Sequence, residues 1–312
     1  MVSDSAIHSL AGAAGGIVAM SATYPLIVLS TRAAVNVQND SENIAQHFLR
    51  IVKREGIAGL YSGLSPSLLG IAVTNGVYYY FYERSREIIL NSRQGSKALS
   101  MLESMLAGVI AGSATTIISN PIWVIQTSQA VRVEPSPSEL SSSRAVVRRP
   151  SILRTIQAII AKDGLNGFFR GLGPALVLVI NPVLQYTVFE QLKNFLIKRR
   201  TSKLRAEGFG NAAAVLSDWD FFVFGALSKL VATGSTYPYI VLKSRLQAGQ
   251  ACAEGYKSSS HGLATILKEE GIQGLYKGIS SKLLQSVLTA AILFAVQRRI
   301  YELTKKAITP LS

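Results

Sequence analysis

The sequence predicts an all-α membrane protein, with six transmembrane helices in three pseudosymmetric repeats and three short helices on the membrane surface. Two observations support this prediction: an apolar composition, and a pair of motifs that occurs three times. The 312 residues are 48% hydrophobic and only 16% charged, and the mean hydropathy is +0.29. This apolar content exceeds that of an ordinary soluble domain and favours a membrane protein.

The chain is strongly basic, with 32 Lys and Arg against 18 Asp and Glu and a net charge of +14. Most of this charge lies between the apolar stretches, as expected where loops meet anionic lipid headgroups or where a path conducts anions. We therefore expect membrane lipids as partners and no nucleic acid. Cys252 is the only cysteine, and no Cys/His cluster, secretory signal or nucleophile with a base appears in the sequence. We expect no metal, no cofactor and no catalytic residue.

Six stretches approach the roughly 20 residues that a membrane-crossing helix needs. They are residues 5–31, 64–82, 101–131, 172–189, 219–242 and 279–297. Charge is rare inside them, but Lys229 lies within the fifth stretch and Lys282 near the start of the sixth. A charged group within a span usually faces a bundle interior or a watery cavity, so both lysines are candidates for substrate binding. For Lys282, snorkelling to the interface is the alternative.

A proline inside each odd-numbered span begins a motif that recurs along the chain. The three copies read Tyr-Pro-Leu-Ile-Val-Leu from Tyr24, Asn-Pro-Ile-Trp-Val-Ile from Asn120 and Tyr-Pro-Tyr-Ile-Val-Leu from Tyr237. Each copy is followed by an acid-Gly pair and a Gly-x-aromatic-x-Gly signature, at residues 55–63, 163–171 and 270–278. The three matched copies predict three homologous units, residues 1–98, 99–205 and 206–312.

Between the two motifs of each repeat, apolar residues spaced by three and four predict a short amphipathic helix on the membrane surface. These helices cover residues 44–53, 152–160 and 263–267. The second repeat is longer because of residues 133–150, which are rich in Ser, Pro and Arg. We expect this insertion to be a flexible loop and assign it no chemistry.

The proline motif, the glycine signature and the six-span layout together resemble the mitochondrial carrier family over about residues 5–305. The resemblance implies a transporter rather than an enzyme, built as a barrel of tilted helices around a central site that opens alternately to either side. It implies kinks at Pro25, Pro121 and Pro238. A proline can kink a spanning helix because neighbouring groups satisfy the carbonyl that it frees.

On the side of the prolines, this sequence departs from the family pattern. The family usually has an acid two residues after each proline and a base three residues further. Here the acidic positions hold Ile27, Trp123 and Ile240, and the basic positions hold Ser30, Gln126 and Lys243. The ring of ion pairs that closes this side in the family therefore cannot form. We expect apolar contact at the three former acidic positions to close it instead.

On the opposite side, the family closes with an aromatic-acid-x-x-base motif at the end of each even-numbered span. Two copies remain, Tyr82 to Arg86 and Phe189 to Lys193, whereas residues 297–301 have neither charge as expected. The resemblance therefore implies at most one ion pair between repeats in the family's arrangement, Glu83 with Lys193.

The family's substrate contacts fall seven residues after the last glycine of each signature. These positions hold Gly70, Leu178 and Gln285, and a shorter fourth span leaves Val177 and Val179 as alternatives to Leu178. A glycine beside aliphatic residues leaves room for a flat adenine ring. Phosphate binding then falls to basic residues elsewhere, of which the candidates are Lys229, Lys282, Lys243, Arg245 and Arg32.

Several segments are similar to the peroxisomal branch of the family, which transports adenine nucleotides and related cofactors. They are residues 120–124, 178–182 and 274–291. The resemblance implies a multi-pass protein of the peroxisomal membrane that exchanges ATP and AMP, coenzyme A, FAD or NAD. The basic residues 198–205, which we expect to form a loop, resemble the branch's targeting cluster and imply an import receptor for membrane proteins as a partner. Binding anionic lipid or setting the membrane orientation is the alternative.

Two other functions stay open from the sequence. The first is a carrier of nucleotides, folate or flavin in the mitochondrial inner membrane. The second, from another class, is a structural peroxisomal membrane protein that recruits assembly factors through residues 198–205. Nucleotide exchange in liposomes separates a transporter from a scaffold.

Overall fold

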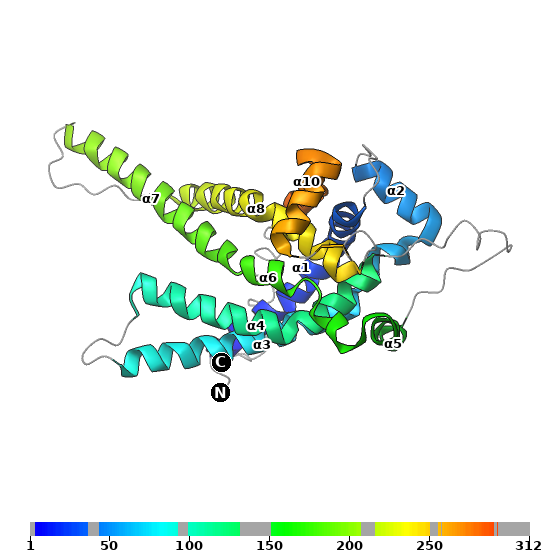
Figure 1. Ribbon diagram of the computed structural model, residues 1–312. Helices are drawn as coiled ribbons and strands as arrows, with labels where there is room; N and C mark the ends of the chain where they lie inside the picture. The colour runs from blue at the N-terminus through cyan, green and yellow to red at the C-terminus, as the bar shows by residue number, and fades with distance from the viewer. Residues whose placement is uncertain are drawn as a thin grey trace, which may run out of the picture. The chain divides into compact units, whose positions relative to one another are not determined.

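The computed structural model describes residues 4–36, 44–92, 99–131, 151–206, 216–249, 255–256, 258–289 and 292, and the regular structure of these residues is helical (Figure 1). The long helices are α1 (Asp4–Val35), α3 (Leu64–Asn91), α4 (Met101–Ala130), α7 (Ile180–Ala206) and α8 (Asp218–Ala248). The short helices are α2 (Ile44–Glu55), η1 (Ile57–Tyr61), α5 (Ile152–Asp163), η3 (Gly164–Phe169), α6 (Leu172–Val177) and α10 (Ser259–Leu275). Residues 279–289 form a further helix.

Four stretches of the described helices are both long and apolar enough to cross a membrane: Gly16–Val35, Ile57–Asn91, Met101–Ala130 and Ile152–Ala206. The fifth predicted span lies within α8, which is one continuous helix of 31 residues. Lys229 and the polar residues from Thr233 to Thr236 lower the hydropathy of this helix. Of the sixth predicted span, residues 279–289 are helical. Most of residues 290–297, the motif at 297–301 and the insertion at 133–150 lie outside the described residues.

The three predicted surface helices are present as α2, α5 and the first part of α10. Each ends at the acid-Gly pair, because the glycine takes up a positive φ that other residues rarely adopt: φ is 70° at Gly56, 64° at Gly164 and 68° at Gly271. In α10 this glycine is a kink between two helical stretches. The conserved geometry of the three copies follows from the repeated acid-Gly pair.

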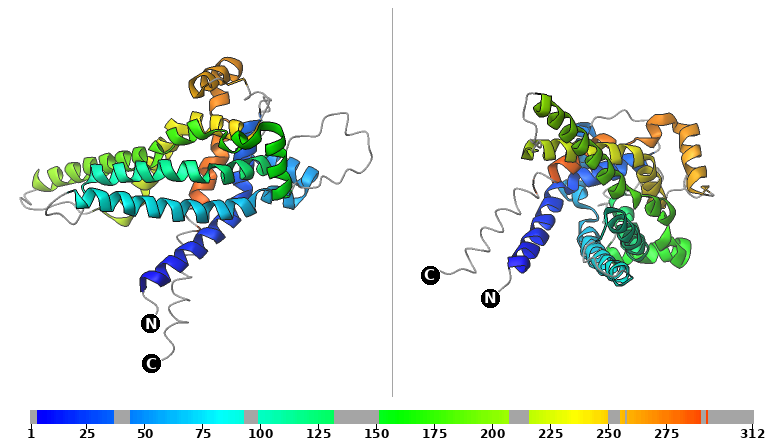
Figure 2. Two further views of the ribbon diagram at one scale, coloured as in Figure 1. Left: turned by 60° about the horizontal axis from the view of Figure 1, so that its bottom comes forward. Right: turned by 90° about the vertical axis from the view of Figure 1, so that its left-hand side faces the viewer.

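Two compact units divide the chain, and each takes segments from all three predicted repeats. Unit 1 contains residues 1–75, 119–171 and 241–312, and unit 2 contains residues 76–118 and 172–240. Unit 1 therefore holds the three surface helices and the C-terminal ends of α1, α4 and α8. In unit 2, α7 lies alongside the N-terminal part of α8, as Figures 1 and 2 both show.

The fourth predicted span is not one helix, because it breaks between α6 and α7 at Leu178 and Val179. Pro182 explains the break, since it has no N–H for the Leu178 carbonyl and its ring crowds that carbonyl. The Leu178 carbonyl instead accepts from the Asn181 N–H at 3.0 Å, and the Val179 N–H donates to the Leu176 carbonyl at 3.2 Å. The helix thus tightens locally and then resumes.

Candidate substrate path and gates

The C-terminal ends of α1, α4 and α8 are joined by a cyclic set of hydrogen bonds in unit 1. In each repeat, the side chain seven residues after the motif proline donates to the carbonyl nine residues after the proline of the next repeat. The three bonds are Arg32 Nε to Ala130 O at 2.7 Å, Ser128 Oγ to Gln247 O at 3.2 Å, and Arg245 Nε to Ala34 O at 3.0 Å. We call this set the carbonyl ring.

The carbonyl ring satisfies groups that a helix end leaves unpaired. The last four carbonyls of a helix have no partner within it, and Ala34, Ala130 and Gln247 all lie in the last turns of their helices. A guanidinium at this end also interacts favourably with the negative end of the helix dipole. Each repeat therefore caps the C-terminal end of the proline-containing helix of the next repeat, α4, α8 or α1.

Both arginines of the carbonyl ring are also held by the acid of an acid-Gly pair. Arg32 forms two bonds with Glu55, at 2.7 and 3.0 Å. Arg245, whose side chain is 1% exposed, forms two bonds with Glu270, of which Nη2 to Oε2 measures 2.9 Å. Lys277 also contacts Glu270, at 2.7 Å. Burial acts to raise the pKa of Glu270, but hydrogen bonds from Arg245 and Lys277 outweigh it and hold that pKa below its ordinary value.

The second repeat lacks this arginine, and its acid is paired differently. Ser128 stands at the ring position, and Asp163 pairs with Arg170 at 2.7 Å. A second connection between the second and third repeats comes from Lys162, which donates to the Gly249 carbonyl at 3.1 Å. At the junction between the second and third repeats, the donor to the carbonyl is therefore the Ser128 hydroxyl, whereas the other two junctions use a guanidinium.

A close approach of backbones supports the same junctions. Gly63 and Gly171, the last glycines of the first two signatures, have φ values of 86° and 72°. A Cβ on Gly63 would lie 2.9 Å from the Gln126 carbonyl oxygen, and one on Gly171 would lie 3.1 Å from the Lys243 carbonyl oxygen. Gln126 and Lys243 stand at two of the three positions where the family has a base. Their backbone carbonyls thus contact the last signature glycine of the preceding repeat.

The predicted apolar gate and the predicted substrate position meet in unit 1. A Cβ on Gly70 would lie 3.3 Å from Trp123 Cζ2 and 3.4 Å from Ile122 Cγ2. Ile27 of α1 packs against the buried cluster of Met20, Tyr24 and Val28, and apolar residues of α3, among them Leu68, pack against the same cluster. Pro25 and Pro121 belong to unit 1 with these residues, whereas Pro238 and Ile240 belong to unit 2. The structure therefore brings Trp123 onto Gly70 of α3, and it places Ile27 against the cluster of α1 that α3 also contacts.

In unit 2, the pair α7 and α8 is pinned at both ends. At one end, Asn181 Nδ2 donates to the Ala232 carbonyl at 3.1 Å and to Thr236 Oγ1 at 2.7 Å. At the other end, Arg200 forms two bonds with Asp220, at 2.6 and 2.8 Å. Lys229 lies three residues before Ala232, so it is about one helical turn from the break in the fourth span. Within the described residues its side chain is half-buried and makes no hydrogen bond or ion pair.

The residues around that break differ in what they contact. A Cβ on Gly112 of α4 would lie 2.7 Å from Val179 Cγ1, so Val179 is directed to a neighbouring helix. Val177 is 41% exposed and Leu178 is partly buried. These contacts favour Leu178 and Val177 over Val179 as residues that face a substrate.

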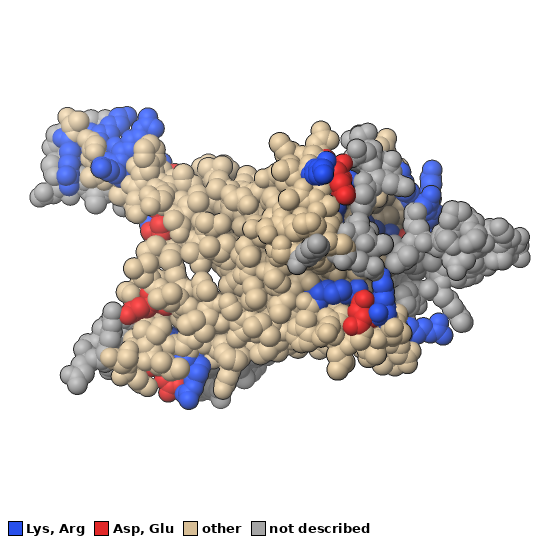
Figure 3. Space-filling view, viewed as in Figure 1, with Lys and Arg blue, Asp and Glu red and all other residues tan. Residues whose placement is uncertain are grey.

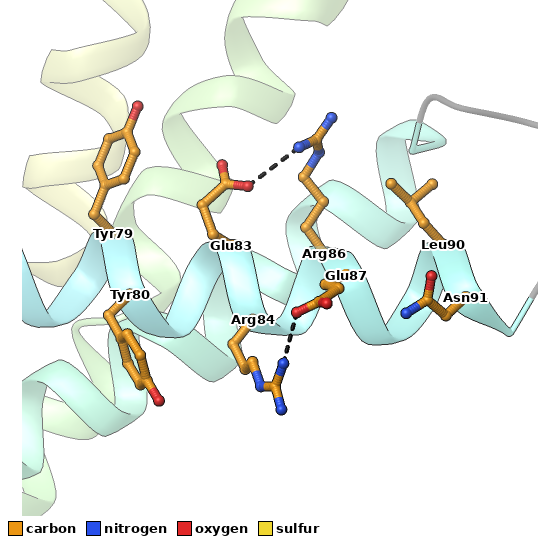
Figure 4. Close-up of a pocket in the computed structure, with 8 residues that line it drawn as sticks. All are labelled: Tyr79, Tyr80, Glu83, Arg84, Arg86, Glu87, Leu90 and Asn91. Carbon is orange, nitrogen blue, oxygen red and sulfur yellow. Dashed lines mark hydrogen bonds and ion pairs between the residues drawn. The ribbon is translucent and has the colours of Figure 1, made fainter.

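The predicted pair Glu83 and Lys193 is not formed between the helices in this structure. Glu83 accepts from Arg86 at 3.1 Å, and Lys193 pairs with Glu190 at 2.6 Å, each within its own helix. Figure 4 shows Glu83 and Arg86 beside a second pair of α3, Arg84 with Glu87, along a shallow hollow lined by residues of that helix alone. The pairing of Glu83 with Lys193 stays a prediction for a state in which this side closes.

Basic side chains gather at the end of α7, at the upper left of Figure 3. Lys198, Arg199, Lys203 and Arg205 are exposed there, whereas Arg200 is held by Asp220. The segment 198–205 is therefore a helical surface rather than an irregular loop.

In the described part of the chain, no group of three or more His, Cys, Asp or Glu side chains could hold a metal ion.

The family profile described as mitochondrial carrier protein matches residues 3–93, 97–200 and 215–310. The chain belongs to this family. It is therefore a six-helix, three-repeat membrane transporter and not an enzyme, as the sequence predicted. The division at residues 98 and 205 stays a prediction.

Curated relatives of this carrier include proteins of the peroxisomal membrane. It is 36% identical to the peroxisomal nicotinamide adenine dinucleotide carrier of Arabidopsis thaliana, with 96% of each chain covered. It is 32% identical to peroxisomal membrane protein PMP47B of Candida boidinii, over 93% of this chain and 84% of the relative. It is 29% identical to peroxisomal membrane protein PMP34 of Mus musculus, over 95% and 92%. These similarities confirm the predicted location: the carrier is a multi-pass protein of the peroxisomal membrane.

The sequence did not identify three groups that the structure brings into this site. They are Ser128 with the carbonyls of the carbonyl ring, the acids Glu55 and Glu270 as partners of Arg32 and Arg245, and Asn181 at the helix break. Counting a fixed offset of seven from each proline would have found the first group, because Arg32, Ser128 and Arg245 share it.

Proposed function

We propose that this carrier exchanges adenine-containing cofactors across the peroxisomal membrane by alternating access, with NAD as the first candidate beside ATP, AMP, coenzyme A and FAD. The observation that carries the proposal is the full-length similarity to the Arabidopsis carrier named for nicotinamide adenine dinucleotide, with 96% of each chain covered. A likeness that spans all three repeats includes every helix that lines a carrier's central path.

The geometry around Gly70 supports a flat ring as part of the substrate. Gly70 is buried and contributes no side chain, and the face of α3 that it occupies lies against Trp123. If Trp123 moves aside when the proline side opens, it uncovers a site of the width of an aromatic ring. Indole and adenine rings stack favourably, so Trp123 can both cover the empty site and contact the substrate.

We assign the binding of the substrate's phosphates to Lys229, Lys282 and Lys243. Glu55 and Glu270 already occupy Arg32 and Arg245, so these arginines serve the carbonyl ring in the state described here. Lys229 is a half-buried ammonium beside the helix break. A lysine suits a phosphate that has to bind and leave quickly, because it acts as a point charge rather than as a bidentate clamp.

The exposed cations at the end of α7 support a separate role. We propose that Lys198, Arg199, Lys203 and Arg205 bind an acidic surface of an import receptor, with anionic lipid as the alternative partner. The pinning of this end by Arg200 and Asp220 keeps the four side chains on an ordered helix. Replacing the four cations by Gln should move a tagged carrier out of peroxisomes, and a purely lipid-binding role would leave its location unchanged.

Counter-exchange in liposomes tests the transport proposal. Purified carrier is reconstituted into liposomes loaded with labelled AMP, and NAD, ATP, coenzyme A or FAD is added outside. Exit of label that depends on one of these external cofactors supports exchange, and the order of the rates ranks the substrates. No exit of label with any of them would overturn the proposal that this carrier exchanges adenine-containing cofactors.

A further inference from the structure

A chain of hydrogen bonds connects α1 to the helix of residues 279–289 in unit 1. Thr23 Oγ1 donates to the Ala19 carbonyl at 2.8 Å, and it lies 3.5 Å from the Met20 carbonyl. Thr289 Oγ1 lies 2.9 Å from Thr23 Oγ1, and Gln285 Nε2 donates to Thr289 Oγ1 at 3.0 Å. The two threonines and Gln285 therefore form one continuous polar path between two spans.

The direction of this chain follows from the number of hydrogens. A threonine hydroxyl has one hydrogen to donate and two lone pairs to accept with. The hydrogen of Thr23 goes to the backbone of its own helix, so the bond between the hydroxyls uses the hydrogen of Thr289. Thr289 can then only accept from Gln285. The amide of Gln285 consequently has to face Thr289 with its nitrogen and not with its oxygen.

The same orientation leaves the amide oxygen of Gln285 without a partner among the residues that the structure describes. Gln285 is 9% exposed, and its Oε1 is buried with no hydrogen-bond partner among the described residues. Buried polar atoms are nearly always paired, so an unpaired acceptor on a contact position of a transporter requires an explanation. An acceptor oxygen repels phosphate oxygens, so Oε1 itself cannot bind a phosphate, and one of the two hydrogens of the amide nitrogen is already donated to Thr289.

We propose that Gln285 Oε1 accepts a hydrogen bond from a neutral N–H donor of the substrate, either the amino group of the adenine ring or the carboxamide of a nicotinamide. Thr289 and Thr23 act as positioning residues that fix the amide orientation. This inference rests on the proposed function, and it assigns Gln285 to the selection of the base or amide rather than to phosphate binding.

Two analogues of NAD separate the two donors. Nicotinamide hypoxanthine dinucleotide lacks the adenine amino group, and nicotinic acid adenine dinucleotide lacks the carboxamide N–H. In liposomes loaded with labelled AMP, the wild-type carrier should exchange NAD about tenfold faster than one of them at low external concentration, because a buried acceptor left unpaired weakens binding by about that factor. The analogue that is rejected identifies the donor.

Variants then test the residues. Gln285→Leu keeps a side chain of similar volume and removes the acceptor. The rate of exchange with NAD should then lie within about twofold of the rate with the rejected analogue. Thr289→Val removes the fixed orientation and should lower the ratio of these two rates, whereas Thr289→Ser should retain it. Thr187→Val is the matched control, because the Thr187 hydroxyl donates to the Val183 carbonyl of its own helix and bonds no other helix among the described residues.

Each result decides the proposal. Equal rates for NAD and both analogues with the wild-type carrier would overturn the role of Gln285 while leaving nucleotide exchange intact. No exit of label with NAD, with either analogue, or with ATP, coenzyme A or FAD would overturn both the inference and the proposed function. If Gln285→Leu does not fold, the contrast of Thr289→Val with Thr289→Ser still tests the orientation. If a folded Thr289→Val carrier still prefers NAD over the rejected analogue by the same factor, the threonines do not position the Gln285 amide.

Discussion

Replacing Arg245 by Met should destabilise this carrier more than any other single change in the carbonyl ring. The substitution removes the two bonds to Glu270 and the bond to the Ala34 carbonyl. Both partners are deeply buried, with side chains 1% and 5% exposed. Removing one member of a buried ion pair costs about 3–5 kcal/mol, because the other charge stays behind. Lys277 still contacts Glu270, so we expect the lower end of this range, about 3 kcal/mol.

The three positions of the carbonyl ring should differ in how much a substitution destabilises the carrier. Arg32 and Glu55 are 12% and 13% exposed, so Arg32→Met should cost less than Arg245→Met. Ser128→Ala removes one neutral hydrogen bond and should cost about 1 kcal/mol. Arg84→Met is the control, because Arg84 pairs with Glu87 on an exposed face where the side chains are 62% and 56% exposed. Such a surface pair contributes about 0–1 kcal/mol.

Thermal unfolding of the purified carrier in detergent measures the order. A loss of about 3 kcal/mol corresponds to a fall in Tm of roughly 6–12 °C. The double variant Arg245→Met with Glu270→Gln should be more stable than Arg245→Met alone, because it removes a buried carboxylate that keeps only Lys277 as its charged partner. A Tm for Arg245→Met equal to that of Arg84→Met would refute the reasoning. So would a double variant less stable than the single one.

Three further predictions concern the gate, the phosphates and pH. Trp123→Ala should raise uncoupled efflux of labelled nucleotide from liposomes, since it removes the side chain against Gly70; unchanged efflux with intact exchange would place the plug elsewhere. Lys229→Ala and Lys282→Ala should each lower cofactor exchange at least about tenfold, whereas Lys268→Ala on the exposed face of α10 should not; normal exchange in both would remove them from the site. The pKa of Glu270 is depressed in the folded state, so its pairing stabilises above the unfolded value of 4.5 and this stability is lost as pH falls below it. Glu270→Gln should therefore flatten the decline of Tm at acid pH, and an equal decline in both proteins would exclude Glu270 as the cause.

Much of the fold could be predicted from the sequence because the repeated motifs determine the structure of the residues next to them. A proline at a fixed place, an acid-Gly pair and a run of apolar residues each act within a few residues, so their effects can be read in order along the chain. The break in the fourth span also has a local cause, Pro182, but its position at Leu178 needed the observed hydrogen bonds.

The site was harder to predict because its contacts join residues far apart in the chain. Arg32 and Arg245 were candidates for phosphate binding on charge alone, and their engagement by Glu55 and Glu270 depends on how the surface helices pack. The direction of the hydrogen bonds from Gln285 through Thr289 to Thr23 depends on a contact between α1 and the helix of residues 279–289. Sequence distance gives no indication of such pairs.

The three junctions of the carbonyl ring differ in how the contact is distributed over side chains. In two of them the donor to the carbonyl is a guanidinium that a carboxylate also holds. The junction between the second and third repeats instead combines the Ser128 bond at 3.2 Å with the bonds of Thr127 to Gln247 Oε1 and of Lys162 to the Gly249 carbonyl, both at 3.1 Å. Because several side chains share this junction, the loss of one hydroxyl weakens it without opening it. The carrier therefore has two junctions that are sensitive to a single charged residue and one that tolerates the loss of a single hydroxyl.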